Sequence, residues 1–317
     1  MHRHPLSAPL ALLMLLAAML LAACGAAPPT TSGAATAAVA TGEAVAPTVA
    51  AVGETAQAAV GTSGDLLSAV RERGTLLVAT DSNYAPQSFR NPDESWEGFD
   101  IEVAREIAKR LGVEVEFLDI NFDVVTAGGW NGRWDINVGS MTITPGRKEV
   151  LLFTTPYYYT PAAFAVHADS TATDVASLEG KTIGVGAATT YLDYLNGDLV
   201  LEGEEILVDP PTATVQIYDT DVLALQDLAL GDGTRLDAVL TALPTIENAV
   251  ANGEPVKALG QPVYYEALAV ALDKSSPQDS QSLADEISRI IEEMRADGTL
   301  TRLSEQFYGV DIATKQN

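Results

Sequence analysis

Apolar side chains recur along residues 72–312 with two alternating periods, one typical of helices and one typical of strands. In residues 99–111 an apolar side chain returns at every fourth position, which predicts a helix that ends at Gly112. The same spacing predicts helices around residues 283–294 and 300–307. Residues 121–133 contain two adjacent glycines, so we expect only a short or distorted helix there.

Short runs with strand character separate these helices. In residues 113–117 apolar and polar side chains alternate, which is the period of a half-buried strand. Further strands are predicted at residues 76–80, 134–138, 182–185 and 236–240, and His167 is expected at a strand end. Because strands and helices follow one another in turn, we expect an α/β fold with parallel or mixed sheets flanked by helices.

Polar segments directly follow three of the predicted strands, at residues 81–84, 139–147 and 187–190. In parallel sheets ligands bind at the carboxyl ends of strands, so we expect these segments to converge on one site. The segment 139–147 reads Gly-Ser-Met-Thr-Ile-Thr-Pro-Gly-Arg. Arg147 can hold a carboxylate through two parallel N–H bonds, and Ser140 and Thr142 can add a hydroxyl donor each. The alternative is a strand-to-helix turn with Thr144 as N-cap and an exposed Arg147.

The N-terminus has the pattern of a targeting segment. Residues 1–23 combine a short polar start containing Arg3 with an apolar core at residues 10–21, which is too short to span a membrane. We interpret them as a signal peptide. Leu-Ala-Ala-Cys at residues 21–24 resembles the lipobox of bacterial lipoproteins, in which the cysteine is lipidated. The alternative is an ordinary signal peptide that ends near a chance cysteine.

Composition narrows the possible chemistry. Cys24 is the only cysteine, which excludes an intrachain disulfide and a Cys-rich metal site. After residues 1–23 are removed His167 is the only histidine, so a His-cluster metal site is excluded and Ser-His-Asp catalysis is disfavoured. We expect neither a metal nor a cofactor. Residues 25–64 are rich in Ala, Thr, Gly and Pro and cannot bury a core, so we assign residues 24–71 to the lipidated cysteine and a flexible tether.

The mature chain is strongly acidic. Its 17 basic and 43 acidic residues leave a formal net charge of −26. This charge argues against nucleic acid and anionic membrane surfaces as partners. An anionic ligand would need a local positive site, for which Arg147 is the candidate.

A set of short motifs follows in order along residues 72–312. They are Asp-Ser-Asn-Tyr-Ala-Pro at 81–86, Gly-Phe-Asp-Ile at 98–101, Ser-Met-Thr-Ile-Thr-Pro-Gly-Arg at 140–147, Leu-Glu-Gly-Lys at 178–181, Arg-Leu-Asp-Ala-Val at 235–239 and Ala-Asp-Gly-Thr at 296–299. This ordered set resembles the family 3 extracellular solute-binding proteins, the amino-acid receptors of ABC importers.

The resemblance implies a type II periplasmic-binding-protein-like fold. In that fold two α/β lobes are joined by two crossing strands, and the lobes close around a ligand by a hinge motion. It places the crossings near Tyr159 and Leu268. Lobe one would cover residues 72–159 plus 268–317, and lobe two would cover residues 160–267.

The resemblance also assigns roles to individual residues. Arg147 would grip the ligand's α-carboxylate, with a hydroxyl from Thr142 and backbone groups from Gly139 and Ser140. Thr190 would donate to the same carboxylate from lobe two.

Three further residues would surround the ligand's side chain. Tyr84 and Phe122 would form aromatic walls, although both could instead be core aromatics. Asp81 matches the position that meets the cationic side chain in receptors for basic amino acids, although it could instead cap the next turn.

One departure from the family pattern concerns the ligand's ammonium group. The family usually carries an acid that pairs with it where this chain has Ala242. A buried ammonium without a carboxylate is costly, so either another acid supplies the charge or the ligand lacks an α-amino group. Glu266 and Asp81 are the candidate substitutes. Ala188 also replaces a usual glycine, and residues 210–221 form a longer segment than the family norm.

These observations predict a lipid-anchored receptor, outside the cytoplasm in the periplasm or at the cell surface, that performs no chemistry. We expect a monomer that binds an amino acid or a related small carboxylate and delivers it to ABC permease subunits. Two alternatives stay open. One is a cyclohexadienyl-dehydratase-like enzyme on the same fold, with Glu266 as general acid. The other is a sensory binding module.

Overall fold

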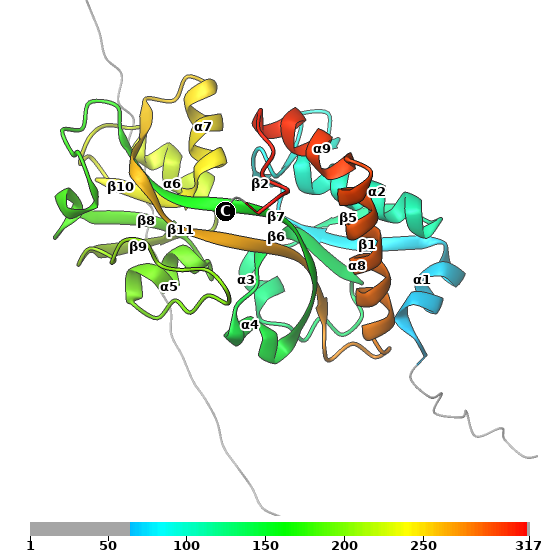
Figure 1. The fold of residues 1–317 in the computed structure, drawn as a ribbon. Helices are drawn as coiled ribbons and strands as arrows, with labels where there is room; N and C mark the ends of the chain where they lie inside the picture. Colours follow the sequence, from blue (N-terminus) through cyan, green and yellow to red (C-terminus); the bar gives the residue numbers. More distant parts are fainter. Residues whose placement is uncertain (1–63, 316–317) are drawn as a thin grey trace, which may run out of the picture. The chain divides into compact units, whose positions relative to one another are not determined.

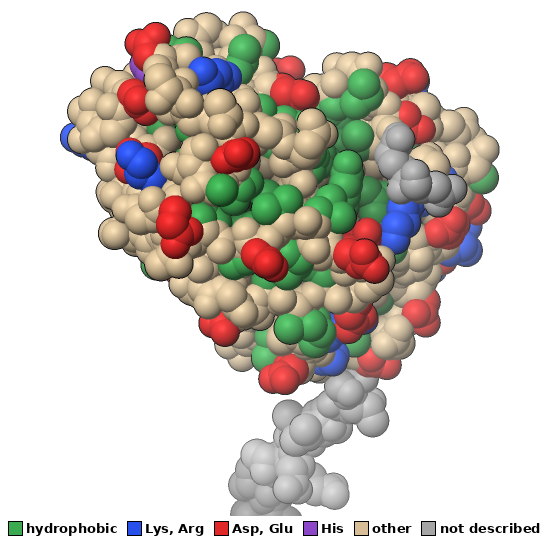
Figure 2. All heavy atoms as spheres, turned by 60° about the vertical axis from the view of Figure 1, so that its left-hand side comes forward, with side chains coloured by type: hydrophobic (Ala, Val, Ile, Leu, Met, Phe, Trp, Pro, Cys, Tyr) green, Lys and Arg blue, Asp and Glu red, His purple; other side chains and the backbone are tan. Residues whose placement is uncertain are grey.

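The computed structural model describes residues 64–315. The predicted signal peptide, Cys24 and residues 25–63 of the tether lie outside the described residues. Acidic side chains are spread over the face drawn in Figure 2, in keeping with 43 Asp and Glu against 18 Lys and Arg. Within residues 64–315 no helix is long and apolar enough to cross a membrane.

The first helix corrects the predicted tether. The tether was expected to reach residue 71, but Leu66–Arg73 form α1. The Asp65 side chain caps this helix by accepting a hydrogen bond from the backbone N–H of Ser68. Leu66 and Val70 lie four positions apart and are both buried in the core. One apolar helix face is enough to dock the segment, so residues 66–71 do not belong to a flexible tether.

An eight-stranded mixed sheet organises the described residues, in the order β5-β1-β6-β11-β7-β10-β8-β9. At one end β5 (Glu114–Asp119), β1 (Thr75–Thr80) and β6 (Ile136–Thr142) are parallel. At the other end β10 (Ala238–Ala242), β8 (Thr182–Gly186) and β9 (Thr214–Tyr218) are parallel. A small second sheet contains β2 (Asn83–Tyr84), β3 (Ser88–Arg90) and β4 (Trp96–Glu97).

Two long strands join the two ends of the sheet. β7 (Leu151–His167) has 17 residues, and β11 (Val256–Asp273) has 18. They pair antiparallel along most of their length, and Figure 1 shows them running side by side between two groups of elements. We call the group with β1–β6, α1–α4, α8 and α9 lobe one, and the group with β8–β10 and α5–α7 lobe two. The lobe ranges and crossing points expected from the resemblance stay predictions.

The helices cover both lobes. Lobe one has α2 (Phe99–Leu111), α3 (Phe122–Thr126), α4 (Pro145–Val150), α8 (Gln281–Ala296) and α9 (Thr299–Tyr308). Lobe two has α5 (Thr190–Asn196), α6 (Asp221–Leu228) and α7 (Leu243–Ala251), and a 3₁₀ turn spans Val175–Leu178.

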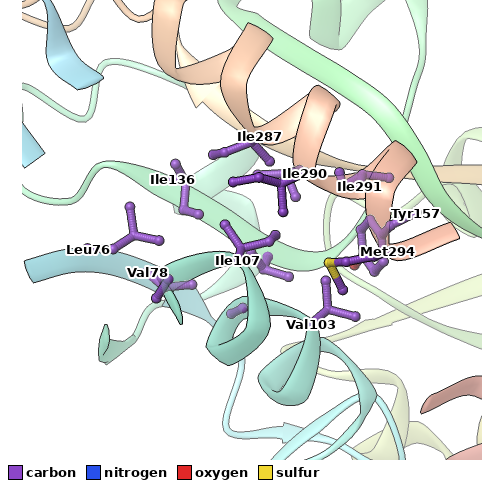
Figure 3. Packing of buried hydrophobic residues seen from close by; sticks show 14 of the residues in the cluster. Leu76, Val78, Val103, Ile107, Ile136, Tyr157, Ile287, Ile290, Ile291 and Met294 are labelled. Atoms are coloured by element: carbon purple, nitrogen blue, oxygen red, sulfur yellow. The ribbon is translucent and has the colours of Figure 1, made fainter. Parts of the chain in front are cut away.

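Each lobe has its own hydrophobic core. In lobe one Ile287, Ile290 and Met294 of α8 face Val103 and Ile107 of α2, over the strands of the sheet (Figure 3). All five side chains are fully buried, and burying each stabilises the fold by roughly 1.5–3 kcal/mol. Lobe two has a separate core under α5 and another under α6 and α7. The two lobes are packed separately and joined by two long strands, so the ends of several strands lie between them.

Most predicted elements are confirmed. The helices expected at 99–111, 283–294 and 300–307 are α2, α8 and α9, and residues 121–133 contain only the five-residue α3. β7 ends at His167, as expected. Several strand ends differ from the prediction, most clearly in two strands. The strand expected to stop at residue 138 continues to Thr142, because Thr142 and Met141 pair with Leu268 and Ala269 of β11. The strand expected at 236–240 lies at Ala238–Ala242.

Candidate functional site

A cavity that is partly open to solvent lies at the ends of strands from both lobes. Lobe one contributes Asp81, Tyr84, Phe122, Gly139, Ser140, Thr142 and Arg147. Lobe two contributes Gly186, Ala187, Thr189, Thr190, Tyr191, Asp219, Thr220 and Asp221, and β11 adds Glu266. The structure therefore brings together every ligand-binding residue predicted from the sequence.

The lobes touch directly around this cavity. The Asn83 side-chain amide donates to Thr220 Oγ1 at 3.0 Å, and the Gln87 amide donates to Thr245 Oγ1 at 3.2 Å. On another side, Lys148 of α4 pairs with Glu202 of lobe two. Hydrogen bonds that cross between lobes at several points define a closed conformation.

Arg147 enters the cavity from the short helix α4. Thr144 caps that helix by accepting from the Arg147 backbone N–H at 3.2 Å, with Pro145 as the first helical residue. The capping interpretation is thus confirmed, but the exposed arginine that went with it is wrong. The Arg147 side chain is buried, and its guanidinium donates to Thr142 O at 3.0 Å and Ala188 O at 2.9 Å. It also lies over the Phe122 ring, 5.3 Å from the centroid.

The Arg147 guanidinium is a buried charge without a close counter-ion. Within residues 64–315 no carboxylate oxygen lies within 4.0 Å of its nitrogens. Burial lowers the pKa of Arg147, while the more distant Glu266 and Asp193 oppose that shift. A buried cation held only by neutral carbonyls is costly, so this geometry is suited to a bound anion.

A second buried charged group of the cavity is Glu266, on β11. Its carboxylate accepts hydrogen bonds from Thr142 Oγ1 at 2.6 Å, from Thr190 Oγ1, and from the Tyr191 hydroxyl at 3.0 Å. Burial raises the pKa of Glu266, and these three donors and Arg147 counteract the rise. The Thr142 and Thr190 hydroxyls, expected to donate to a ligand, here donate to Glu266.

The Ser140 hydroxyl does not face the cavity as a free donor, which corrects a prediction. It donates to Asp100 Oδ2 at 2.7 Å and accepts from the Tyr158 hydroxyl at 2.6 Å. The Ser140 backbone N–H donates to the Tyr157 hydroxyl at 3.1 Å. The reason is the left-handed backbone at Ser140, with φ of 53°, which turns the side chain into the core. At neighbouring Gly139 a Cβ would meet the Asn137 amide nitrogen at 2.9 Å, so a larger residue there would displace the Asn137 side chain.

Asp81 both caps a turn and lines the cavity. Its carboxylate accepts the Asn83 backbone N–H at 2.7 Å, as the capping alternative predicted. Burial raises the pKa of Asp81, and the nearby Asp119 adds to the rise. Only Oδ1 of Asp81 takes part in this capping hydrogen bond, and Oδ2 does not.

Sequence reasoning missed Asp221, the first residue of α6. Its carboxylate is buried and accepts the Gly186 backbone N–H at 2.7 Å and the Thr241 hydroxyl at 2.9 Å. Burial raises the pKa of Asp221 to about 7. The available signal was its position in a polar segment directly after a strand. Ala242, where the family pattern expects an acid, is buried and is not among the residues that line the cavity.

Comparison with known proteins agrees with the resemblance. The family model for bacterial extracellular solute-binding proteins, family 3, matches residues 76–310. The L-cystine-binding protein TcyJ of Escherichia coli is 32% identical over 250 residues, which cover 78% of this chain and 87% of the relative. The L-arginine-binding protein of Pseudomonas aeruginosa is 27% identical over 246 residues, covering 75% of this chain and 89% of the relative.

Solved structures show the same fold. An ancestral arginine-binding protein bound to glutamine has a TM-score of 0.64 and 30% identity, covering 75% of this chain and 99% of that one. An ancestral amino acid-binding protein, described as a precursor of cyclohexadienyl dehydratase, has a TM-score of 0.66 and 27% identity, covering 77% and 100%. These names are those of binding proteins rather than enzymes. Because the family model matches more than half of the sequence, this chain belongs to family 3 of the bacterial extracellular solute-binding proteins.

Proposed function

We propose that the protein binds an amino acid or a related small carboxylate in the cavity between its lobes. It then delivers the ligand to the permease subunits of an ABC importer. The observation that carries the proposal is the buried Arg147 guanidinium, which has no protein carboxylate within 4.0 Å among the described residues. Relatives named for binding cystine and arginine support the amino-acid class.

The geometry suggests how binding and closure are linked. Arg147 belongs to lobe one, yet one of its N–H groups donates to Ala188 O of lobe two. Its other N–H groups are available to a ligand carboxylate in the bidentate arrangement that guanidinium favours. A ligand held by Arg147 thus stabilises the closed conformation, because the same side chain reaches both lobes.

The test is a titration of the full chain with the standard amino acids and L-cystine, before and after Arg147→Ala. Loss of a buried charge partner typically costs 2–5 kcal/mol, so we expect affinity to fall by about 30-fold to several thousand-fold. Arg133→Ala is the matched control, since Arg133 is exposed and lies over Trp134, away from the cavity. Unchanged affinity in the Arg147 variant would refute the site.

The lipid anchor belongs to the same proposal. Cys24 would carry the lipid and the following tether would hold the folded lobes outside the membrane, where the protein acts as a monomer. We expect Cys24→Ser to abolish incorporation of a labelled fatty acid and to release the protein from the membrane fraction. A variant that stays labelled and membrane-bound would contradict the anchor.

A further inference from the structure

Among the residues that the structure describes, Asp221, like Arg147, is a buried ionisable side chain without a close partner of opposite charge. Its carboxylate is buried on the cavity wall, and no Lys, Arg or His nitrogen lies within 4.0 Å of it within residues 64–315. The charged groups that influence it most are two other acids, Glu266 and Asp81, which both disfavour its ionised form. A carboxylate has about four acceptor sites, and the hydrogen bonds from Gly186 and Thr241 occupy two of them.

The other acids of the cavity are differently placed. Asp219 is exposed, and Asp81 is only partly buried and caps a turn. Glu266 accepts hydrogen bonds from three hydroxyl groups, and the positive charge of Arg147 favours its ionised form. Asp221 is therefore the buried acid of this cavity that receives only neutral donors and no cationic neighbour.

The two unbalanced charges attach to the same short loop. Asp221 Oδ1 accepts the Gly186 backbone N–H, and the Arg147 guanidinium donates to the Ala188 carbonyl. Three residues span at most roughly 10 Å when fully extended. The left-handed φ of 58° at Ala188 turns this segment, so the chain between the two attachment points is not straight. The loop thus carries a buried anion at one end and a buried cation at the other, on the wall of one cavity.

We propose that Asp221 binds the cationic nitrogen of a zwitterionic ligand, whose carboxylate is held by Arg147. This inference rests on the proposed function and narrows it, because it requires an ammonium group and disfavours simple carboxylates. Thr241 donates to Asp221 at 2.9 Å and directly precedes Ala242. The α6 carboxylate therefore lies beside the end of β10, and a helix residue supplies the charge that Ala242 lacks.

Proton competition gives this role a signature that a structural residue would not show. The titratable groups that face Asp221 are Glu266, Asp81, Tyr84, Tyr191 and Tyr264. Burial keeps the pKa of the three tyrosines well above the usual value, so they stay neutral. With the pKa of Asp221 raised to about 7, a proton occupies the carboxylate at lower pH. Affinity for an ammonium ligand should then fall by up to about tenfold per pH unit below 7.

The experiment compares an amino acid with its desamino analogue. The full chain is titrated with the standard amino acids and L-cystine, and the tightest binder is paired with the carboxylate in which hydrogen replaces the ammonium. Asp221→Asn is the test variant, because its amide can still accept from Gly186 and the Thr241 hydroxyl can rotate to accept. We expect it to weaken the amino acid by about 30-fold or more and the analogue by less than about threefold.

Asp232→Asn is the matched control, since it removes one negative charge from lobe two at an exposed position that does not line the cavity. It should change both affinities by less than about threefold. If Arg147→Ala abolishes binding but Asp221→Asn leaves the amino acid unaffected, the inference is refuted while the receptor function stands. Tighter binding of the desamino analogue than of the amino acid would also refute the inference and leave the receptor function standing. If neither ligand class binds, the proposed function fails as well.

A second measurement covers the case in which Asp221→Asn does not fold. The pH profile of the unmodified chain should then show amino-acid affinity falling as pH drops below 7, with the desamino analogue spared. Parallel profiles for the two ligands would overturn the assignment of Asp221.

Discussion

At the scale of single residues, two non-glycine residues at the cavity have an unfavourable backbone conformation. Ser140 has a φ of 53° and Ala188 a φ of 58°, in the left-handed region that costs an L-residue roughly 1–2 kcal/mol. Each of these conformations orients one polar group toward a specific partner. The Ser140 backbone turns its hydroxyl to Asp100, and Ala188 presents its carbonyl to Arg147. The strain lies where the surrounding structure holds the backbone in place.

Asp100 gives a residue-scale prediction about pH. It is fully buried below Ser140 and accepts from Ser140 Oγ and the Tyr157 hydroxyl, and burial raises its pKa to about 7. Because the folded state keeps the proton that the unfolded state loses near pH 4, stability should fall as pH rises from about 4 to 7. Asp100→Asn should flatten that decline by a few kcal/mol, at about 1.4 kcal/mol per pKa unit.

Urea denaturation without ligand, at pH 4.5 and pH 8 as rough limits of this window, measures the effect. Asp221 has a pKa raised to about 7 as well, so the decline should be reduced rather than removed in the Asp100 variant. A variant whose stability falls with pH as steeply as that of the unmodified chain would show that Asp100 is ionised in the native state.

At the scale of elements, local pattern was sufficient for α2, α8 and α9, but it missed α1 and the lobe-two helices and was insufficient for strand ends. α2 is readable because its apolar face repeats every fourth residue and Gly112 closes it in the left-handed conformation. β6 is extended by pairing with β11, whose residues lie more than a hundred positions later. In β7 the prolines Pro156 and Pro161 argue against a central strand, yet register shifts in the β7–β11 pairing accommodate the irregular stretch near Pro156.

Contacts between residues that are far apart in the chain also limited what could be predicted of the site. Arg147 and Thr142 belong to one short motif at the end of β6, so their chemistry could be recognised in the sequence. Asp221 depends on Gly186, 35 positions earlier, and on Thr241, 20 positions later. No local pattern connects these three residues. The hydrogen bond from the Thr142 hydroxyl to Glu266, 124 positions away, could not be predicted from the sequence for the same reason.

Helix α1 gives the element-scale prediction. If it is part of lobe one, truncating its buried face should destabilise the fold as a core substitution does. Val70 is fully buried against the core, so Val70→Ala should cost about 1–3 kcal/mol. Glu72→Ala, on the exposed face of the same helix, should stay within about 0.5 kcal/mol. Chemical denaturation of both variants measures their free energies of unfolding. Equal losses in the two variants would show that α1 is not packed against lobe one.

At the scale of the whole described unit, ion pairs add to the contacts that join the lobes. One loop of lobe two is held from two directions. Glu202 pairs with Lys148 of α4, while Glu204 pairs with Lys315, which also donates to Gly203 O. In a chain with a formal charge of −25, these lysines place positive charge where the lobes meet. Part of the closing free energy should therefore depend on ionic strength.

Lys148→Glu tests that dependence, because it puts like charges opposite each other only when the lobes close. An exposed ion pair contributes about 0.2–1 kcal/mol, so ligand affinity should fall by about two- to fivefold at low salt. The loss should shrink as added salt shortens the Debye length to about 3 Å near 1 M. Lys109→Glu changes the net charge equally, but its partner Glu106 lies on the same helix, so it should leave affinity unchanged. Equal losses in both variants, or a loss that persists at high salt, would show that net charge or local packing acts in place of a salt-sensitive contact between the lobes.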